Sequence, residues 1–358
     1  MKIAILTHGI SPSGREYAHV FAERGHEAEV FSMSAYRPEE GERVRVLAPW
    51  EFRPWESRSR LVPYVRVLWF LRRALAEFRP DVVYAIYLSS AGVLACLSGH
   101  PRVVVSAQGS DILTRRGSRL WRAVWRWQAR RSCFVHAVSE PIAEVLRGAG
   151  IPLDKILVAP MGVDTARLPL IEPLKRPNAG RIICTRAHKP VYDQTTLVRA
   201  LARLQARGMP FHATFFETFG VESTRALVRE ASLEGAVSFR PAYRLEDLPL
   251  LLAEADVYVS CSLSDGTSSS LLEAMSTGTF PVVSDIAANR PWVEHGRTGL
   301  LFPPGDDAAL ADRLEEALAR PELRAAAAPI SRAIAVEKGD LTTESGKLVA
   351  AFERCLAK

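Results

Sequence analysis

The sequence predicts an α/β protein made of two Rossmann-like, doubly wound domains. Its 358 residues exceed what one small domain needs, and 48% hydrophobic with 24% charged residues is typical of a globular protein. Short β-branched runs alternate with longer amphipathic stretches, which indicates βα units on parallel sheets. A segment with three prolines, residues 164–180, interrupts this alternation. We therefore expect an N-terminal domain (1–164), a linker (165–180), a C-terminal domain (181–340) and a final helix (341–358) that can cross back to the first domain.

Each element is placed by its apolar pattern. Near-continuous apolar runs predict strands covered on both faces, and one-sided apolar stretches predict helices. In the first half we expect strands near 2–7, 28–33, 44–49, 82–86, 102–107, 133–138 and 156–160, and helices near 14–24, 62–78, 89–98, 117–131 and 140–148. In the second half we expect strands near 181–186, 211–216, 237–240, 256–261 and 280–284, and helices near 194–207, 221–232, 246–254, 269–277, 307–319 and 341–356. The Ala-rich stretch 321–337 is too weakly patterned to assign.

Composition excludes several classes of protein. No stretch of about 20 apolar residues is free of charges, so a membrane-spanning helix is not expected. The first apolar run is too short for a signal peptide. The five cysteines are scattered and form no C-x-x-C pair, which argues against a disulfide framework or a structural zinc site and favours a reducing cytoplasm.

The net charge of +6 is unevenly distributed. Residues 1–164 hold 23 Lys and Arg against 16 Asp and Glu, a net of +7, and the remainder has a net of −1. Six of the seven tryptophans also lie in the first half. A basic, aromatic half suggests an anionic partner, which is a nucleic acid, a membrane surface or a phosphorylated substrate.

The loop after the first strand, residues 7–14, does not match a dinucleotide site. It lacks G-x-G-x-x-G, and no acid ends the second strand where a ribose partner would stand. A dinucleotide-dependent dehydrogenase is therefore disfavoured. The backbone amides before Gly14 can still bind a phosphate or a sugar, and a simple tight turn is an equal alternative.

Residues 264–275 are the most informative stretch. Asp265 ends an apolar strand, Gly266 allows a close turn, and Glu273 lies one to two turns into the next helix. The unsatisfied amides of that helix's first turn suit an anion or sugar hydroxyls. Alternatively, Asp265 only caps the helix and Glu273 is a surface residue. The residues suited to cap the helix are Thr267, Ser268 and Ser269.

With Gly278-x-x-Pro281-Val282-Val283 after it, this stretch resembles the donor-binding signature of GT-B glycosyltransferases, in particular glycosyltransferase family 4. The family pattern is E-G-F-G-x-x-x-L-E-A-M-A-x-G-x-P-V-V. Asp265 stands for its first acid and Glu273 for its second. Residues 24–27, 155–164 and 296–306 resemble three further family segments, so the resemblance covers nearly the whole chain.

The resemblance implies a retaining transferase that uses a nucleotide-sugar, needs no metal or other cofactor, and binds its donor in a cleft between the two domains. Glu273 would bind the ribose, Asp265 the donor-sugar hydroxyls, and the amides from Gly266 onward the diphosphate or sugar. The family places an Arg and a Lys after the first strand of the second domain to stabilise the departing diphosphate. Arg186 and Lys189 meet that requirement here, with His188 as a weaker candidate.

Two further groups are implied by the resemblance. Where the family often has H-G-x-D after the fifth strand, this chain has Gln108, Gly109 and Asp111. Gln108 can bind a hydroxyl but cannot titrate, which suits a front-face transfer in which a leaving-group phosphate oxygen takes the acceptor proton. His8 is an alternative polar partner on this side, and His136 is expected in the core. Lower-ranked residues near the donor or its base are Asp285 and Asn289.

Residues 115–131 contain seven arginines, three tryptophans and no acid. Trp121 and Trp125 share one helical face, and most arginines lie on the opposite one. This pattern is typical of helices that attach to a membrane surface. Three uses remain open: an anionic membrane or lipid-linked acceptor, an anionic soluble acceptor, or tryptophans packed inside with solvated arginines. No nucleic-acid reader module is present.

The sequence therefore predicts a cytoplasmic hexosyltransferase. On the membrane hypothesis, this enzyme is also peripheral to the membrane. It would move a sugar from a nucleotide-sugar, expected to be a UDP-sugar, to a hydroxyl of an acceptor sugar, a lipid-linked acceptor or a natural product. The alternatives are a sugar-nucleotide-binding or membrane-peripheral scaffold with weak catalysis, and a sugar-nucleotide epimerase of the same fold.

Overall fold

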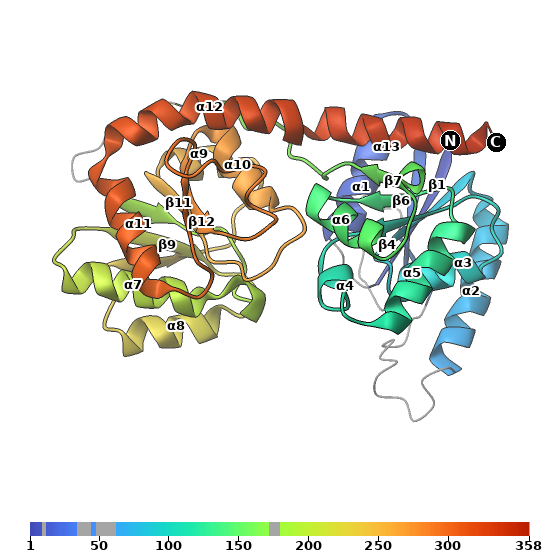
Figure 1. The fold of residues 1–358 in the computed structure, drawn as a ribbon, viewed down its shortest axis with the longest axis horizontal. Coiled ribbons are helices and arrows are strands. Elements are labelled where there is room, and N and C mark those ends of the chain that lie inside the picture. The colour runs from blue at the N-terminus through green and yellow to red at the C-terminus, as the bar shows by residue number, and fades with distance from the viewer. Residues whose placement is uncertain (9–11, 34–43, 48–61, 172–179, 358) are drawn as a thin grey trace. The chain divides into compact units, whose positions relative to one another are not determined.

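The computed structural model describes residues 1–8, 12–33, 44–47, 62–171 and 180–357 (Figure 1). The chain divides into two compact units. Unit 1 comprises Met1–Met161 and Thr342–Lys358, and unit 2 comprises Gly162–Leu341. The end of the expected strand 44–49 and much of the expected linker lie outside the described residues.

In unit 1, the described residues form one parallel sheet in the order β3-β2-β1-β4-β5-β6-β7. The strand order reverses beside β1, which pairs with both β2 and β4. In doubly wound sheets, ligands bind beyond the carboxyl ends of the strands at such a point. The strands are β1 (Lys2–Thr7), β2 (Glu27–Ser32), β3 (Val44–Val46), β4 (Val82–Ile86), β5 (Val103–Ala107), β6 (Val135–Ala137) and β7 (Ile156–Val158).

Helices cover this sheet, and the last one returns to it from the end of the chain. Phe352 of the last helix packs against Phe21 and Tyr84, with ring centroids 5.6 and 5.5 Å away. The helices are α1 (Pro12–Glu23), α2 (Val62–Phe78), α3 (Ser90–Leu97), α4 (Ser110–Leu113), α5 (Arg119–Arg131), α6 (Glu140–Gly148), the 3₁₀ turn η1 (Leu153–Lys155) and α13 (Leu341–Leu356).

In unit 2, the described strands form a second parallel sheet in the order β10-β9-β8-β11-β12-β13. The order reverses beside β8, which pairs with β9 and β11. The loops after β8 and β11 therefore leave the same edge of the sheet side by side. The strands are β8 (Arg181–Ile183), β9 (His212–Phe216), β10 (Val237–Arg240), β11 (Val257–Ser260), β12 (Phe280–Ser284) and β13 (Leu300–Phe302).

The helices of unit 2 cover its sheet, and α12 also packs against α10. Residues 162–171 run along α10 and α12, where Arg332 donates to the carbonyl oxygens of Leu168 and Thr165. This part of the expected linker is therefore held by unit 2. The helices are η2 (Pro190–Tyr192), α7 (Gln194–Ala206), α8 (Val221–Glu230), α9 (Leu248–Ala253), α10 (Ser269–Thr277), α11 (Asp307–Ala319) and α12 (Pro321–Gly339).

The two α/β folds and most elements confirm the prediction, with several differences. The helix expected at 117–131 begins at Arg119 because the Ser118 hydroxyl caps it, accepting from the Trp121 amide at 3.4 Å. The unassigned stretch 321–337 is helix α12. Its buried residues recur every four residues but, apart from Leu323, are small, so their apolar signal is weak, and Pro329 lies inside the helix. The short helix α4, the 3₁₀ turns η1 and η2 and the short strand β13 were not predicted.

Candidate active site

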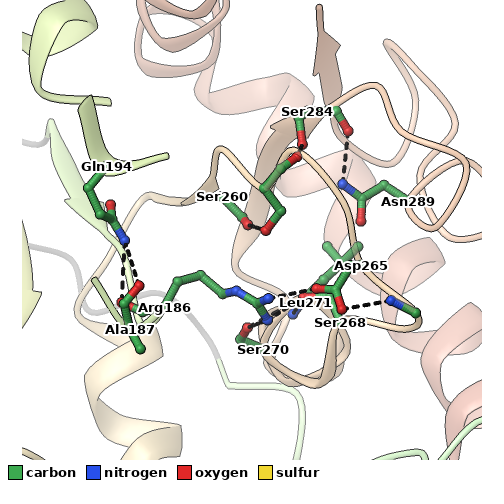
Figure 2. Close-up of polar contacts among 12 residues, drawn as sticks. Arg186, Ala187, Gln194, Ser260, Asp265, Ser268, Ser270, Leu271, Ser284 and Asn289 are labelled. Atoms are coloured by element: carbon green, nitrogen blue, oxygen red, sulfur yellow. Dashed lines mark hydrogen bonds and ion pairs between the residues drawn. The ribbon is translucent and has the colours of Figure 1, made fainter. Parts of the chain in front are cut away.

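The strongest polar cluster of unit 2 centres on Arg186, in the loop after β8. Its Nη2 donates to Asp265 Oδ2 at 2.6 Å, and its Nη1 donates to the hydroxyls of Ser268 and Ser270 at 3.2 and 3.0 Å (Figure 2). Asp265 also accepts from the Gly266 amide at 2.8 Å. The parallel pairing of β8 with β11 places the two loops together, so residues 79 positions apart form one ion pair.

Several contacts fix the Arg186 side chain, but its Nε–H donor has no partner among the described residues. The Tyr192 ring lies under the guanidinium at 3.8 Å, a cation–π contact. The side chain is only 10% exposed, and its buried Nε–H has no hydrogen-bond partner among the described residues. Burial lowers the pKa of Arg186 and the Asp265 carboxylate raises it, with a net shift upward, so the group stays charged. A rigid cation with an unsatisfied donor can bind an anion such as a phosphate.

Helix α10 supplies the neighbouring groups. Ser268 caps it by accepting from the Leu271 amide at 3.3 Å, as the sequence predicts. Glu273 is half-buried on this helix. The pKa of the Tyr243 hydroxyl is raised, first by burial and second by the negative charge of the Glu273 carboxylate. Gly266, Thr267 and Ser269 lie between Asp265 and the end of the first turn of α10, so the predicted donor-binding stretch is one continuous segment.

The other basic candidates of this loop behave differently. Lys189 is exposed at the start of η2, and its ammonium makes no ion pair in the described part of the chain. His188 is buried, with its ring nitrogens 2.8 Å from Thr224 Oγ1 and 2.9 Å from the Phe216 carbonyl oxygen. The prediction that His188 can replace Arg186 or Lys189 is therefore wrong, because both ring nitrogens are committed to the fold.

The two lower-ranked residues turn toward their own loop. Asp285 pairs with Arg290 at 2.7 Å, and that hydrogen bond lowers the pKa of Asp285. Asn289 is 2% exposed and donates to the Ser284 carbonyl oxygen at 2.8 Å. Their predicted contact with the donor stays a prediction.

In unit 1, Asp111 organises the turn after β5. One carboxylate oxygen accepts from the amides of Gln108 and Gly109 at 3.1 and 3.0 Å, and the other from the Leu88 amide at 2.7 Å. Gly109 has a φ of +130°, which a side chain rarely adopts. With 3% exposure, Asp111 supports the loop, while Gln108 is half-buried and its Nε2 donates to Ser106 Oγ at 2.6 Å.

His8 and Gly14 lie beside the end of β1. His8 is half-buried, and burial lowers its pKa. A Cβ atom on Gly14 would lie 3.4 Å from the Thr7 methyl carbon, an ordinary van der Waals distance, so the packing of α1 on the strand end does not itself require glycine. Whether either residue contacts substrate stays a prediction.

Sequence reasoning missed three residues. Tyr192 ends the 3₁₀ turn η2 and Tyr243 lies in a loop; neither belongs to a motif, and only their position after strand ends could have marked them. Glu16, on α1, is half-buried, and burial raises its pKa to about 7. A single acid near the start of a helix looks like an ordinary dipole-stabilising residue in sequence, so nothing there indicated its burial.

The hypothesis of membrane-facing tryptophans is wrong for the described helix. Trp125 is fully buried, and Trp121 and Trp127 pack against the core of unit 1. Arg115 covers Trp121 at 4.6 Å, while the arginines of α5 itself are exposed. No helix in the described ranges is long and apolar enough to cross a membrane.

Comparison with known families covers most of the chain. Residues 8–167 match the family model described as Glycosyltransferase Family 4, and residues 180–320 match that of Glycosyl transferases group 1. These matches and the two doubly wound units define the chain as a GT-B glycosyltransferase. It belongs to glycosyltransferase family 4.

Named relatives are distant. The chain is 28% identical over 257 residues to a putative colanic acid biosynthesis glycosyltransferase of Salmonella typhimurium, covering 68% of this chain and 60% of the relative. It is 28% identical over 340 residues to a D-inositol 3-phosphate glycosyltransferase of Pseudarthrobacter chlorophenolicus, covering 84% of this chain and 80% of that relative. The chain thus matches about three-fifths of the length of the first of these relatives.

Solved structures share the fold over the full chain. Sucrose-phosphate synthase from Thermosynechococcus elongatus superposes with a TM-score of 0.83 at 16% identity, covering 100% of this chain and 99% of that one. Anabaena HepE, solved in complex with UDP and glucose, superposes with a TM-score of 0.78 at 21% identity, covering 99% and 100%.

Proposed function

We propose that the protein is a retaining, metal-independent hexosyltransferase that uses a nucleotide-sugar, with UDP-sugars as the first candidates. The observation that carries this proposal is Arg186. It is a buried, charged guanidinium with an unsatisfied Nε–H, held beside the capped start of α10 at the carboxyl edge of the sheet. A fixed cation at this position can stabilise the negative charge that develops on a departing diphosphate.

The proposed reaction is a front-face displacement. The bond between the sugar C1 and the diphosphate oxygen breaks, and the acceptor oxygen bonds to C1 on the same face. The acceptor proton passes to a phosphate oxygen of the leaving nucleotide, so no protein base is required. The non-titrating Gln108 supports this route. Glu273 would bind the ribose, and Asp265, which now pairs with Arg186, would bind sugar hydroxyls once a diphosphate engages the guanidinium.

A donor panel tests the proposal. UDP-glucose, UDP-galactose, UDP-N-acetylglucosamine and GDP-mannose are each incubated with the purified protein and a panel of sugar and lipid-linked acceptors, and released nucleotide is measured. We expect turnover with at least one UDP-sugar and an axial product linkage by NMR. A scaffold would bind a donor without releasing nucleotide, and an epimerase would change the sugar without releasing it. Either result contradicts the proposal.

Metal independence is tested with the same assay. We expect a chelator such as EDTA to leave the turnover rate unchanged after dialysis, because Arg186 supplies the positive charge that a metal ion would provide. Restoring Mg²⁺ or Mn²⁺ serves as the control. A loss of turnover with EDTA that either ion reverses would contradict metal independence without affecting the assignment as a transferase.

We further propose that this is a cytoplasmic enzyme whose unit 1 attaches to an anionic membrane surface, through the arginines of α5 rather than its tryptophans. In unit 2, exposed arginines pair with acids, as Arg203 does with Asp307 and Arg240 with Glu254. The α5 arginines make no ion pair with any described residue. Exposed apolar side chains lie on α2 and α5, which both pack against α3 (Figure 1). They are Leu120 (71% exposed), Val65 (66%) and Trp69 (57%).

Vesicle sedimentation tests the attachment. We expect binding to vesicles containing anionic phospholipid at low salt, and loss of binding at high salt or with neutral vesicles. Arg119→Glu/Arg126→Glu should abolish binding. The control Arg244→Glu/Arg297→Glu makes the same charge change at exposed sites of unit 2 and should bind like the parent. Absence of binding at low salt, or equal loss in both variants, would contradict the attachment.

A further inference from the structure

A chain of hydrogen bonds runs through the core of unit 1 and ends at Gln108. His136 of β6 is fully buried. Its Nε2 lies 2.7 Å from the Ala159 carbonyl oxygen, and its Nδ1 lies 2.8 Å from the Tyr84 hydroxyl and 3.0 Å from Ser106 Oγ. Gln108 Nε2 in turn lies 2.6 Å from Ser106 Oγ. The chain therefore links a core histidine to a half-buried side chain at the carboxyl edge of the sheet.

The Ala159 carbonyl fixes the tautomer of His136. A carbonyl oxygen can only accept, so Nε2 must carry a proton and donate to it. Burial lowers the pKa of His136 to about 4, so the ring is neutral near pH 7. A neutral ring protonated at Nε2 has a bare Nδ1. Nδ1 is therefore an acceptor with one lone pair, which the Tyr84 and Ser106 hydroxyls share as donors at 2.8 and 3.0 Å.

The bare Nδ1 then decides how Gln108 is oriented. Ser106 has one hydroxyl proton, and it is directed at His136. If that proton instead pointed at Gln108, two lone pairs would face each other at 3.0 Å. Ser106 Oγ therefore accepts, and the amide nitrogen of Gln108 turns inward to donate to it. The amide oxygen, Oε1, is left as the group that Gln108 presents outward.

One buried hydroxyl beside Gln108 and another at the end of β1 strengthen this assignment. The Tyr17 side chain lies next to Gln108 and Tyr84, and its hydroxyl is aligned with neither for a hydrogen bond. Thr7 Oγ1, at the end of β1, also has no hydrogen-bond partner among the described residues. Tyr17 and Thr7 are only 2% and 1% exposed. Buried polar groups are rarely left unsatisfied, so this edge of unit 1 is suited to bind hydroxyl groups.

We propose that His136 and Ser106 are positioning residues that fix Gln108 as a hydrogen-bond acceptor for a substrate hydroxyl. The identity of the ligand rests on the proposed transferase function. The assignment of Gln108 as an acceptor rests on the hydrogen-bond network alone. The buried histidine then does more than pack in the core. If its other ring nitrogen carried the proton, the Ser106 proton could turn toward Gln108. Gln108 would then present its amide N–H group to the substrate as a donor in place of its oxygen.

The tautomer is tested without any substrate. Long-range ¹H–¹⁵N NMR of histidine-labelled protein should show His136 with a protonated Nε2 and a bare Nδ1, unchanged between pH 6 and 8. The signal is assigned by its loss in His136→Gln. A ring protonated at Nδ1, or at both nitrogens, overturns the proposal whatever the enzyme's activity.

The ligand is tested with the UDP-sugar that turns over fastest in the donor panel and the acceptor used with it. Ser106→Ala should raise the KM of the substrate that Gln108 contacts by about three- to tenfold and leave kcat within about twofold. Tyr84→Phe is the matched control, because it removes a hydroxyl from the same histidine nitrogen but not from the path to Gln108, and should leave KM unchanged. Melting temperatures confirm folding of each variant.

A double-mutant cycle separates positioning from general destabilisation. In a Gln108→Leu background, Ser106→Ala should have no further effect on KM, because the side chain that it positions is gone. An equal effect in both backgrounds overturns the proposal. Whichever KM rises, that of the donor or that of the acceptor, identifies the hydroxyl's source. If the parent protein turns over no donor while NMR confirms the tautomer, the proposed function fails and the ligand half of this inference fails with it.

Discussion

Replacing Arg186 by alanine is expected to lower turnover by about 10²–10³-fold, the loss seen when one donor to a developing negative charge is removed. The reason lies in the geometry. Arg186 is the buried cation at the start of α10, its Nε–H lacks a partner, and Tyr192 and Asp265 hold its position. Nucleotide release at saturating and limiting donor measures the effect, which should appear mainly in kcat because the charge develops in the transition state.

Three variants sharpen this test. Arg186→Lys keeps the charge but loses the planar fork that Asp265 and the two serines bind, so we expect an intermediate rate. Lys189→Ala should cost less than Arg186→Ala, because its ammonium is exposed and screened by water. Arg240→Ala removes a partly exposed arginine–carboxylate pair between β10 and the end of α9 that does not include Arg186 or Asp265, and should leave turnover unchanged. If Arg186→Ala kept half of the parent rate, the proposed role of Arg186 would be wrong.

The sequence predicted both members of the central pair but not that they bind each other. Arg186 and Asp265 each follow a strand end, and the alternation of strands and helices placed both at one edge of a sheet. It could not show that β8 and β11 are neighbours, because strand order depends on how the whole sheet packs. The pairing also depends on the length of the acidic side chain. Asp265 reaches the Arg186 guanidinium at 2.6 Å, and no motif encodes that fit.

The tryptophans of residues 115–131 show a second limit of predicting structure from the sequence. Helical periodicity identifies which side chains share a face, but a protein core and a bilayer both accept apolar faces. Trp125 is fully buried because α5 lies on the sheet of unit 1, and that contact depends on residues far away in the chain. The arginine face was predicted from the same spacing and is exposed in the structure, since burying unpaired charges would be costly.

Asp111 and His136 illustrate what motifs leave out. The H-G-x-D resemblance placed Asp111 near substrate, while the structure gives both carboxylate oxygens to backbone amides. His136 was correctly expected in the core from the apolar residues around it. Its hydrogen bonds to Ser106 and Ala159 could not be predicted, because they join β6 to its neighbours β5 and β7 and depend on their register.

Replacing Glu273 by alanine is expected to raise the KM of the nucleotide-sugar by about ten- to hundredfold, the usual consequence of losing hydrogen bonds to a charged group. Glu273 lies one turn beyond the Ser268 cap, half-buried beside Tyr243, where a carboxylate can accept from two ribose hydroxyls. The ribose does not react, so its contacts contribute similarly to the ground and transition states. The effect should therefore appear in KM more than in kcat, opposite to that of Arg186→Ala.

The same substitution should leave the fold intact, which makes the result interpretable. Alanine has the highest helix propensity, and Glu273 is not fully buried, so the melting temperature should change little. Glu246→Ala, at a 71% exposed glutamate of unit 2, is the matched control and should not alter KM. If UDP inhibits the Glu273→Ala variant as strongly as the parent, the carboxylate does not bind the nucleoside. If inhibition by UDP weakens in parallel with the rise in KM, the ribose is the group that Glu273 holds, because UDP carries the ribose but no sugar.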